Sequence, residues 1–192
     1  MPQKTLRTFL ALEIEDKVKQ VIVTIQDKVK SSNSIKGSWV DKDNLHLTLK
    51  FLGDIKLDEV ERIIEILNKN FKDEISINCG INKIGVFPDS RFPRILWIGT
   101  ENDSGKIKEL FDKLEDCLSN LGFKKEEREF KTHITISRIK QVFNRDKLDQ
   151  LINDTNSNFT PIPSKITKLT FFESKLSSKG PTYIPLATQN LT

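Results

Sequence analysis

Two short segments, NLHLTLKFLG (residues 44–53) and KTHITISRIK (residues 131–140), repeat one pattern. In each, a histidine is followed by an apolar residue, a threonine and a second apolar residue, and these are the only two histidines in the chain. Alternation of apolar and polar residues predicts a β-strand with one buried face. His46 and Thr48 would then share one face of the first strand, and His133 and Thr135 one face of the second, about 6.5–7 Å apart within each pair.

The elements around the two segments recur in the same order. The spacing of apolar residues predicts strands over 7–14, 45–52, 75–87, 95–100, 130–139, 164–176 and 182–186, and helices over 16–32, 57–71, 106–121 and 146–156. This indicates an α+β fold with two pseudo-symmetric β-α-β-α-β lobes, whose antiparallel sheets flank a central cleft. We expect one catalytic domain over 1–192, with halves of about 1–88 and 89–192, and leave open an exchange of strands between the lobes.

Composition limits the partner and the cellular compartment that we expect for the protein. The net charge of +4 and the pI near 9.0 point weakly to a polyanionic partner such as RNA. Cys79 and Cys117 lie far apart without C-x-x-C spacing, which favours buried free thiols in a reducing compartment. The N-terminal segment lacks the apolar core of a signal peptide, and no apolar run approaches about 18 residues. We therefore expect a cytoplasmic, monomeric protein that does not associate with membranes.

Paired imidazoles suit acid–base chemistry, because one can be neutral while the other is protonated near pH 7. That division fits displacement at a phosphodiester, where nucleophile and leaving group lie on opposite sides of phosphorus. The hydroxyls of Thr48 and Thr135 could donate to the non-bridging oxygens. Arg138 offers a permanent charge with forked donors. It lies five residues after His133, however, so it would point away from the histidine unless the strand twists or ends near Ser137.

Three further groups carry two interpretations each. Phe9 could stack on a base or simply pack. Lys50 shares the face of His46 by strand alternation and could bind substrate, although a lysine near a strand end is usually solvated. Arg91 and Arg94 flank Phe92 in the short connection between the halves, where they could hold RNA phosphates or form an ordinary polar turn.

Other catalytic classes lack their signatures. Zinc catalysis usually takes three protein ligands and a water, and no H-E-x-x-H segment or neighbouring cysteine accompanies either histidine. The chain has no G-x-S-x-G segment and no P-loop. We therefore expect no metal and no cofactor.

The sequence resembles the 2H phosphoesterases, and within them the RNA 2′,3′-cyclic phosphodiesterase branch, historically called 2′-5′ RNA ligase. The resemblance rests on HLTL (46–49) and HITI (133–136), and on flanking matches from Arg7 to about Tyr183: RTFLALEI, Trp39, LKFLG, GVFP, PRILWIG and ESKL. Members of this branch often carry proline directly before the second histidine, whereas this chain has Thr132.

The resemblance implies metal-independent opening of a 2′,3′-cyclic phosphate at an RNA end to leave a 2′-phosphate. It makes His46 the proton donor, His133 the proton acceptor and Arg138 a phosphate contact, whereas the residues alone leave the two histidines interchangeable. The implied substrates are RNA ends, with tRNA fragments and small cyclic nucleotides as candidates. Two alternatives stay open: ligation in the reverse direction, and a non-catalytic module that binds RNA ends.

Overall fold

The computed structural model describes residues 4–101, 105–178 and 180–192. Within these ranges the chain forms nine strands, four α-helices and one short 3-10 helix. In chain order they are β1 (Thr5–Glu13), α1 (Asp16–Ser31), β2 (Ile35–Trp39), η1 (Lys42–Asn44), β3 (His46–Lys56), α2 (Leu57–Asn70), β4 (Ile77–Phe87), β5 (Ile95–Glu101), α3 (Lys106–Ser119), β6 (His133–Val142), α4 (Arg145–Ser157), β7 (Ile162–Ile166), β8 (Lys168–Ser177) and β9 (Gly180–Asn190). None of the described helices is long and apolar enough to cross a bilayer.

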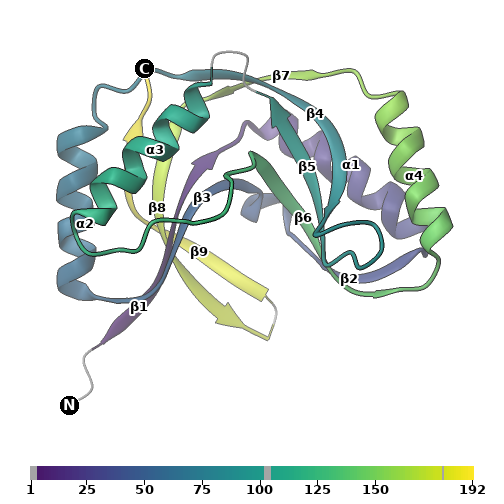
Figure 1. The fold of residues 1–192 in the computed structure, drawn as a ribbon, viewed down its shortest axis with the longest axis horizontal. Coiled ribbons are helices and arrows are strands. Elements are labelled where there is room, and N and C mark those ends of the chain that lie inside the picture. The colour runs from purple at the N-terminus through teal and green to yellow at the C-terminus, as the bar shows by residue number, and fades with distance from the viewer. Residues whose placement is uncertain (1–3, 102–104, 179) are drawn as a thin grey trace.

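The strands form one antiparallel path that is constricted in the middle. Their order is β7-β4-β5-β6-β3-β1-β8-β9, and β2 pairs with the outer part of β6. Between β3 and β6 a single residue pair, Leu47 opposite Ile134, joins the two sides. The constriction separates a first lobe (β3, β1, β8, β9) from a second lobe (β7, β4, β5, β6, β2), seen left and right in Figure 1. The bilobal α+β fold predicted from the sequence is confirmed.

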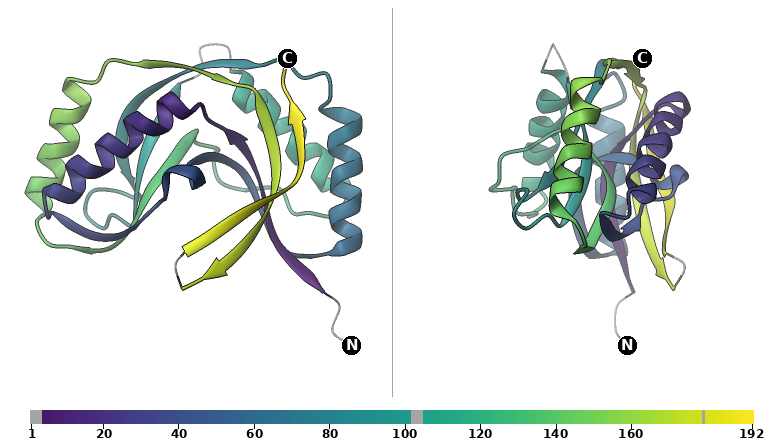
Figure 2. Two further views of the ribbon diagram at one scale, coloured as in Figure 1. Left: turned by 180° about the vertical axis from the view of Figure 1, so that it is seen from behind. Right: turned by 90° about the vertical axis from the view of Figure 1, so that its right-hand side faces the viewer.

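The two lobes do not coincide with the two halves of the chain. Helix α1 follows β1 in sequence but packs on β2 and β6, and α3 follows β5 but lies beside α2 (Figures 1 and 2). A hydrogen bond from Lys113 Nζ on α3 to the Asn70 carbonyl, 2.6 Å, joins these two helices. Strand β4 pairs with β5 and β7, whereas β8 and β9 complete the sheet of β1. Each lobe is therefore built from both halves of the chain.

Two strand predictions differ from the structure. Strand β2 was not expected, because the segment IKGSW is only five residues long and has a glycine, which is depleted in strands, at its centre. Its Gly37 lies so close to β6 that an added Cβ would stand 2.5 Å from Ser137 Oγ, so only glycine fits. The single strand predicted over 164–176 is divided at Thr167 into β7 and β8. The chain passes there from one lobe to the other, since β7 pairs with β4 and β8 with β1.

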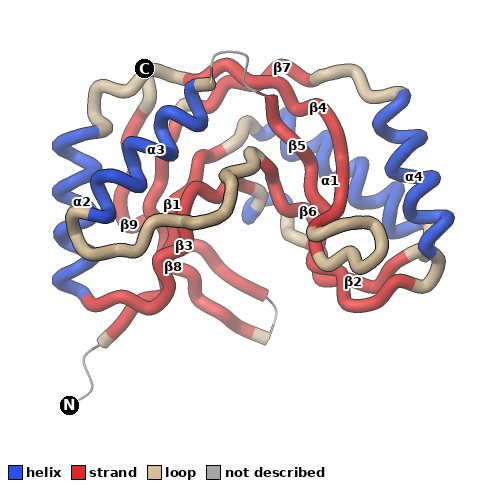
Figure 3. Tube along the Cα trace, in the orientation of Figure 1, coloured by secondary structure: helices blue, strands red, loops and turns tan. Residues whose placement is uncertain are grey.

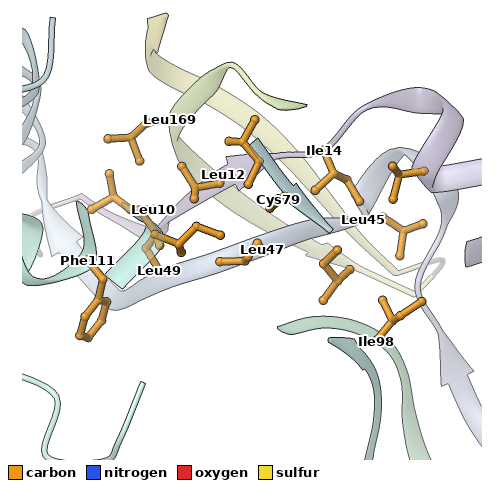
Figure 4. Packing of buried hydrophobic residues seen from close by; sticks show 14 of the residues in the cluster. Leu10, Leu12, Ile14, Leu45, Leu47, Leu49, Cys79, Ile98, Phe111 and Leu169 are labelled. Carbon is orange, nitrogen blue, oxygen red and sulfur yellow. The ribbon is translucent and has the colours of Figure 1, made fainter. Parts of the chain in front are cut away.

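The core runs continuously beneath both lobes. The apolar stripes predicted on the helices are buried, with Val18, Ile22 and Val29 on α1 fully enclosed. In the middle, Leu10 and Leu12 of β1 lie beside Leu47 and Leu49 of β3 (Figure 4). The opposite face of these central strands is consequently the one available for polar side chains.

Each histidine strand carries a β-bulge at the same place. The register between β1 and β3 skips Leu49, and that between β5 and β6 skips Ile136. These are the fourth residues of the two repeated motifs. An unpaired extra residue shifts the alternation by one, so the side chains that follow it change faces.

A buried polar side chain from the opposite half of the chain supports each bulged strand. Gln26 on α1 donates from Nε2 to the carbonyl of the bulge residue Ile136 (2.9 Å) and to that of Val40 (2.8 Å). Glu115 on α3 accepts from Lys50 Nζ (2.6 Å), and its second oxygen accepts from the Glu126 N–H (2.8 Å). Glu126 belongs to the long loop between α3 and β6, tan in Figure 3. Within each lobe, the two halves of the chain are thus tied together where the histidine strand bends.

The prediction that Lys50 shares the face of His46 is wrong. Strict alternation placed it beside His46, but the bulge at Leu49 turns it toward the core, where it is 9% exposed. Its ammonium group pairs with Glu115 and donates to the Lys124 carbonyl (2.8 Å). Lys50 is therefore neither solvated nor directed at the face that carries the histidines.

This buried ion pair yields a stability prediction. Glu115→Ala leaves the Lys50 ammonium buried without its partner and should lower the free energy of unfolding by about 3–5 kcal/mol, measured by urea denaturation. The double variant Lys50→Met/Glu115→Leu should recover most of that loss, because an apolar pair needs no charge partner.

The matched control is Glu109→Ala, which breaks the exposed pair with Lys106 on the same helix. It should change stability by no more than about 0.5 kcal/mol. A Glu115→Ala protein as stable as this control would contradict the role assigned to the buried pair.

Candidate active site

The two histidine motifs lie side by side on one face of the sheet. Leu47 and Ile134, which pair directly, are both fully buried. Residues on either side of a buried strand residue point the opposite way, so His46, Thr48, His133 and Thr135 share the other face. Antiparallel register continued from this pair sets His46 across from Thr135 and Thr48 across from His133. We call the surface formed by these four side chains the histidine face.

Both imidazoles are held in the same way. His46 Nδ1 donates to the Asn44 carbonyl (2.7 Å) and His133 Nδ1 to the Lys131 carbonyl (2.6 Å), each two residues back along the chain. Because a carbonyl can only accept, Nδ1 carries the proton, and Nε2 is the nitrogen that gains or loses one. His46 Nε2 also lies 3.0 Å from Thr48 Oγ1. Each histidine is thus oriented to exchange a proton through Nε2.

Aromatic rings fix the two histidines laterally. The His46 ring lies 4.9 Å from the Phe9 ring and 5.2 Å, edge-on, from the Tyr183 ring. His133 meets Phe87 edge-on at 5.1 Å. Phe9 is 2% exposed and also contacts Phe172, so it has no free face on which a base could stack. The structure favours the packing interpretation of Phe9, as a support for His46.

Burial governs the protonation of His46. Burial is the largest cause that lowers the pKa of this imidazole to about 4; the hydrogen bond to the Asn44 carbonyl opposes the shift, and interactions with Lys19, Arg138 and His133 add to it. His46 in the protein alone is therefore neutral near pH 7. Burial also raises the pKa of the Tyr183 hydroxyl, against the charges of Arg138 and Arg7. Cations from both lobes thus surround the histidine face, which suits an anionic ligand.

The bulge at Ile136 resolves the odd offset of Arg138. In a regular strand, a residue five positions after His133 would point into the core. The extra residue restores Arg138 to the face of His133 and leaves its side chain exposed. Arg138 therefore joins the histidine face without a break in the strand.

The same geometry reveals a residue that the sequence analysis missed. Phe51 lies five residues after His46, is 65% exposed, and has its ring 5.9 Å from that of Phe9. It occupies in β3 the place that Arg138 occupies in β6. Alignment of HLTLKF with HITISR would have paired these two residues and drawn attention to Phe51.

Residues that could hold a metal are not gathered in this region. Among the described residues, no group of three or more histidine, cysteine, aspartate or glutamate side chains could hold an ion. Cys79 is buried and Cys117 half-buried, and both are free thiols. Burial raises the pKa of Cys79 to about 11.

Comparison with known sequences identifies relatives along nearly the full chain. The family described as LigT like phosphoesterase matches residues 12–97 and, again, residues 98–183. The RNA 2′,3′-cyclic phosphodiesterase of Methanocaldococcus jannaschii is 39% identical over 180 residues, which cover 93% of this chain and 96% of that protein. The protein of the same name from Thermotoga maritima is 33% identical over 178 residues, covering 93% and 91%.

Solved structures share the fold. A Thermus thermophilus crystal structure superposes with a TM-score of 0.78 at 22% identity, covering 97% of this chain and 98% of that one. E. coli LigT in its apo form gives 0.74 at 22% identity, covering 99% of each chain. Since the family matches both halves of the sequence, and each half contributes one histidine motif to a shared face, the chain belongs to the LigT-like phosphoesterases.

Proposed function

We propose that this protein hydrolyses 2′,3′-cyclic phosphates at RNA ends to 2′-phosphomonoesters, without a metal ion. The observation that carries the proposal is the pair of imidazoles on one sheet face, each with Nδ1 bonded to a carbonyl and Nε2 left for proton exchange. The relatives named RNA 2′,3′-cyclic phosphodiesterase support the substrate class. A structure of E. coli LigT with 3′-AMP, at 24% identity, supports a nucleotide ligand.

In this mechanism His133 is the base and His46 the acid. Neutral His133 takes a proton from water as the water oxygen attacks phosphorus. The bond from phosphorus to the 3′ oxygen breaks on the opposite side, and protonated His46 supplies the proton that makes the 3′ hydroxyl. Thr48 Oγ1 lies 3.0 Å from His46 Nε2 in the protein alone; with substrate bound, its hydroxyl can donate instead to a phosphate oxygen, which leaves the Nε2 proton of His46 for the 3′ oxygen. Thr135 and Arg138 contact the remaining non-bridging oxygens.

The environment of His46 makes substrate part of its activation. With a pKa of about 4, His46 carries a proton only rarely at neutral pH. A phosphate anion beside the imidazole favours the charged form and raises the pKa. The acid is therefore charged chiefly when the group to be cleaved is in place.

Turnover and product identity test the proposal. An oligoribonucleotide with a 2′,3′-cyclic phosphate should lose the ring in the presence of EDTA and end as the 2′-monophosphate, measured by chromatography and mass spectrometry. His46→Ala and His133→Ala should each lower the rate by roughly 10² to 10⁴, the usual loss of one acid–base group. A cyclic phosphate that stays intact would indicate a binding module, and RNA products longer than the substrate would indicate a ligase. Wild-type rates in either histidine variant would refute the assigned roles.

The low pKa of His46 predicts a pH dependence of stability. Above about pH 6.5 the imidazole is neutral both folded and unfolded; between about 6.5 and 4 only the unfolded chain takes the proton, so stability falls as pH falls. His46→Asn should abolish this contribution, which reaches no more than about 2 kcal/mol at pH 5. Urea unfolding of both proteins from pH 7.5 to 5 measures the difference, and parallel curves would show that burial does not perturb His46.

Phe51 is the proposed contact for the base of the terminal nucleotide. Stacking of a base on an aromatic ring contributes about 1–3 kcal/mol, so Phe51→Ala should raise KM by about 5- to 150-fold with little change in kcat. Phe51→Tyr keeps the ring and should stay near the wild-type KM. The stacking role would fail if the alanine variant matched the tyrosine variant.

A further inference from the structure

A basic cavity lies at the far end of β6 from the histidine face. It has a volume of about 180 Å³ and is lined by the 91–94 loop, by residues 139–142 of β6 and by the first residue of α4. Four of its lining side chains are cationic and none is acidic: Arg91, Arg94, Lys140 and Arg145. We call this cavity the β6-end pocket.

Three of the four cations have no acidic partner among the described residues, and two of these three, Arg94 and Lys140, have no side-chain partner of any kind there. Arg91 pairs with exposed Asp89 at 3.3 Å, and Arg145 donates to the Arg91 carbonyl, which holds the loop against α4. Arg94 and Lys140 are exposed and form no ion pair or side-chain hydrogen bond with any other described residue. The pocket therefore presents a positive potential that an external anion can neutralise.

The pocket and the histidine face lie along the same strand, β6, with Arg138 between them. Ile95, the residue after Arg94, pairs with Arg138 across β5 and β6, and the Arg94 carbonyl accepts from the Ile139 N–H at 2.8 Å. Arg138 thus stands between the histidine face and the pocket. His133 and Lys140 are seven residues apart on one strand, a span of about 20 Å. The cations form a track that leaves the reaction site in one direction.

Exposed aromatic rings accompany these cations. Phe92 lines the pocket and is 68% exposed, and Phe143, directly after Val142 of the lining, is 58% exposed. Neither ring belongs to the core. Cationic side chains that follow a backbone, together with aromatic rings on which bases stack, are the combination that binds single-stranded nucleic acid.

We propose that the β6-end pocket binds backbone phosphates of the RNA strand upstream of the cyclic terminus, with Arg94 and Lys140 as its principal contacts. The inference rests on the proposed function, because it assigns the direction in which the substrate leaves the histidine face. It makes an RNA strand, rather than a cyclic mononucleotide, the preferred substrate. It also gives a role to the 91–94 loop, for which the sequence left an RNA contact and a polar turn equally open.

The test compares one double variant on a short and a long substrate. Arg94→Gln/Lys140→Gln should lower kcat/KM about 10-fold or more for an octaribonucleotide ending in 2′,3′-cyclic phosphate, because two phosphates are then left without a cationic partner. The same variant should hydrolyse a 2′,3′-cyclic mononucleotide within about 2-fold of wild type, since that substrate does not extend to the pocket. The logarithmic dependence of octanucleotide binding on salt should also become shallower by about 1.4, that is, by about 0.7 for each phosphate of a single strand that the protein no longer neutralises.

A matched control separates local binding from overall charge. Arg62→Gln/Lys69→Gln removes one arginine and one lysine from exposed positions on α2, in the other lobe, and should leave both substrates unaffected. Binding of a fluorescent octaribonucleotide ending in 3′-phosphate, followed by anisotropy, gives a readout that needs no turnover. If the Arg94→Gln/Lys140→Gln variant and the control variant bound the octanucleotide equally well, the assignment of the β6-end pocket as an RNA-binding site would be overturned. Tight binding of the octanucleotide without hydrolysis would overturn only the proposed function.

Discussion

One antiparallel residue pair, Leu47 opposite Ile134, joins the two lobes at the centre of the sheet, and the histidine and threonine of each motif are its immediate neighbours. Strand alternation then leaves no choice about where the four polar side chains of the motifs go. Because both central residues are fully buried, the register cannot slip by one position without turning the histidines into the core. The separation of the two imidazoles is thus set by backbone pairing, with no loop involved.

The exchanged helices reinforce this register. Gln26 comes from the first half of the chain and supports the bulge after the second motif, whereas Glu115 comes from the second half and holds Lys50 after the first. A buried polar group loses stability unless its hydrogen-bond partner is in one defined position. Gln26 and Glu115 therefore fix the positions of Ile136 and Lys50 more strictly than apolar contacts would. The bulges that turn Arg138 outward and Lys50 inward are thereby fixed from both sides.

Much of this arrangement could be predicted from the sequence. The order of strands and helices, apart from β2 and the division at Thr167, the buried stripes and the equivalence of the two motifs follow from apolar periodicity and from the repeated H-x-T-x pattern. The bulges could not be predicted, because an extra residue changes no local composition; it appears only when a strand is paired with its neighbour. That single omission accounts for the error on Lys50, for the open question of where Arg138 points and for the neglect of Phe51. An exchange of strands between the lobes was left open, but which elements cross could not be predicted, since the positions of β4, α1 and α3 depend on long-range contacts.

One departure from the near-twofold layout lies beside the motifs: at equivalent places it sets a ring, Phe51, on one side and a cation, Arg138, on the other. A perfectly symmetric pair of imidazoles would accept a phosphodiester in either of two orientations and could cleave it in either sense. Under the proposed function the mismatch would break that degeneracy, because a nucleotide has a flat base at one end and charge along the other. A site built from two similar halves would then bind its substrate in one orientation only.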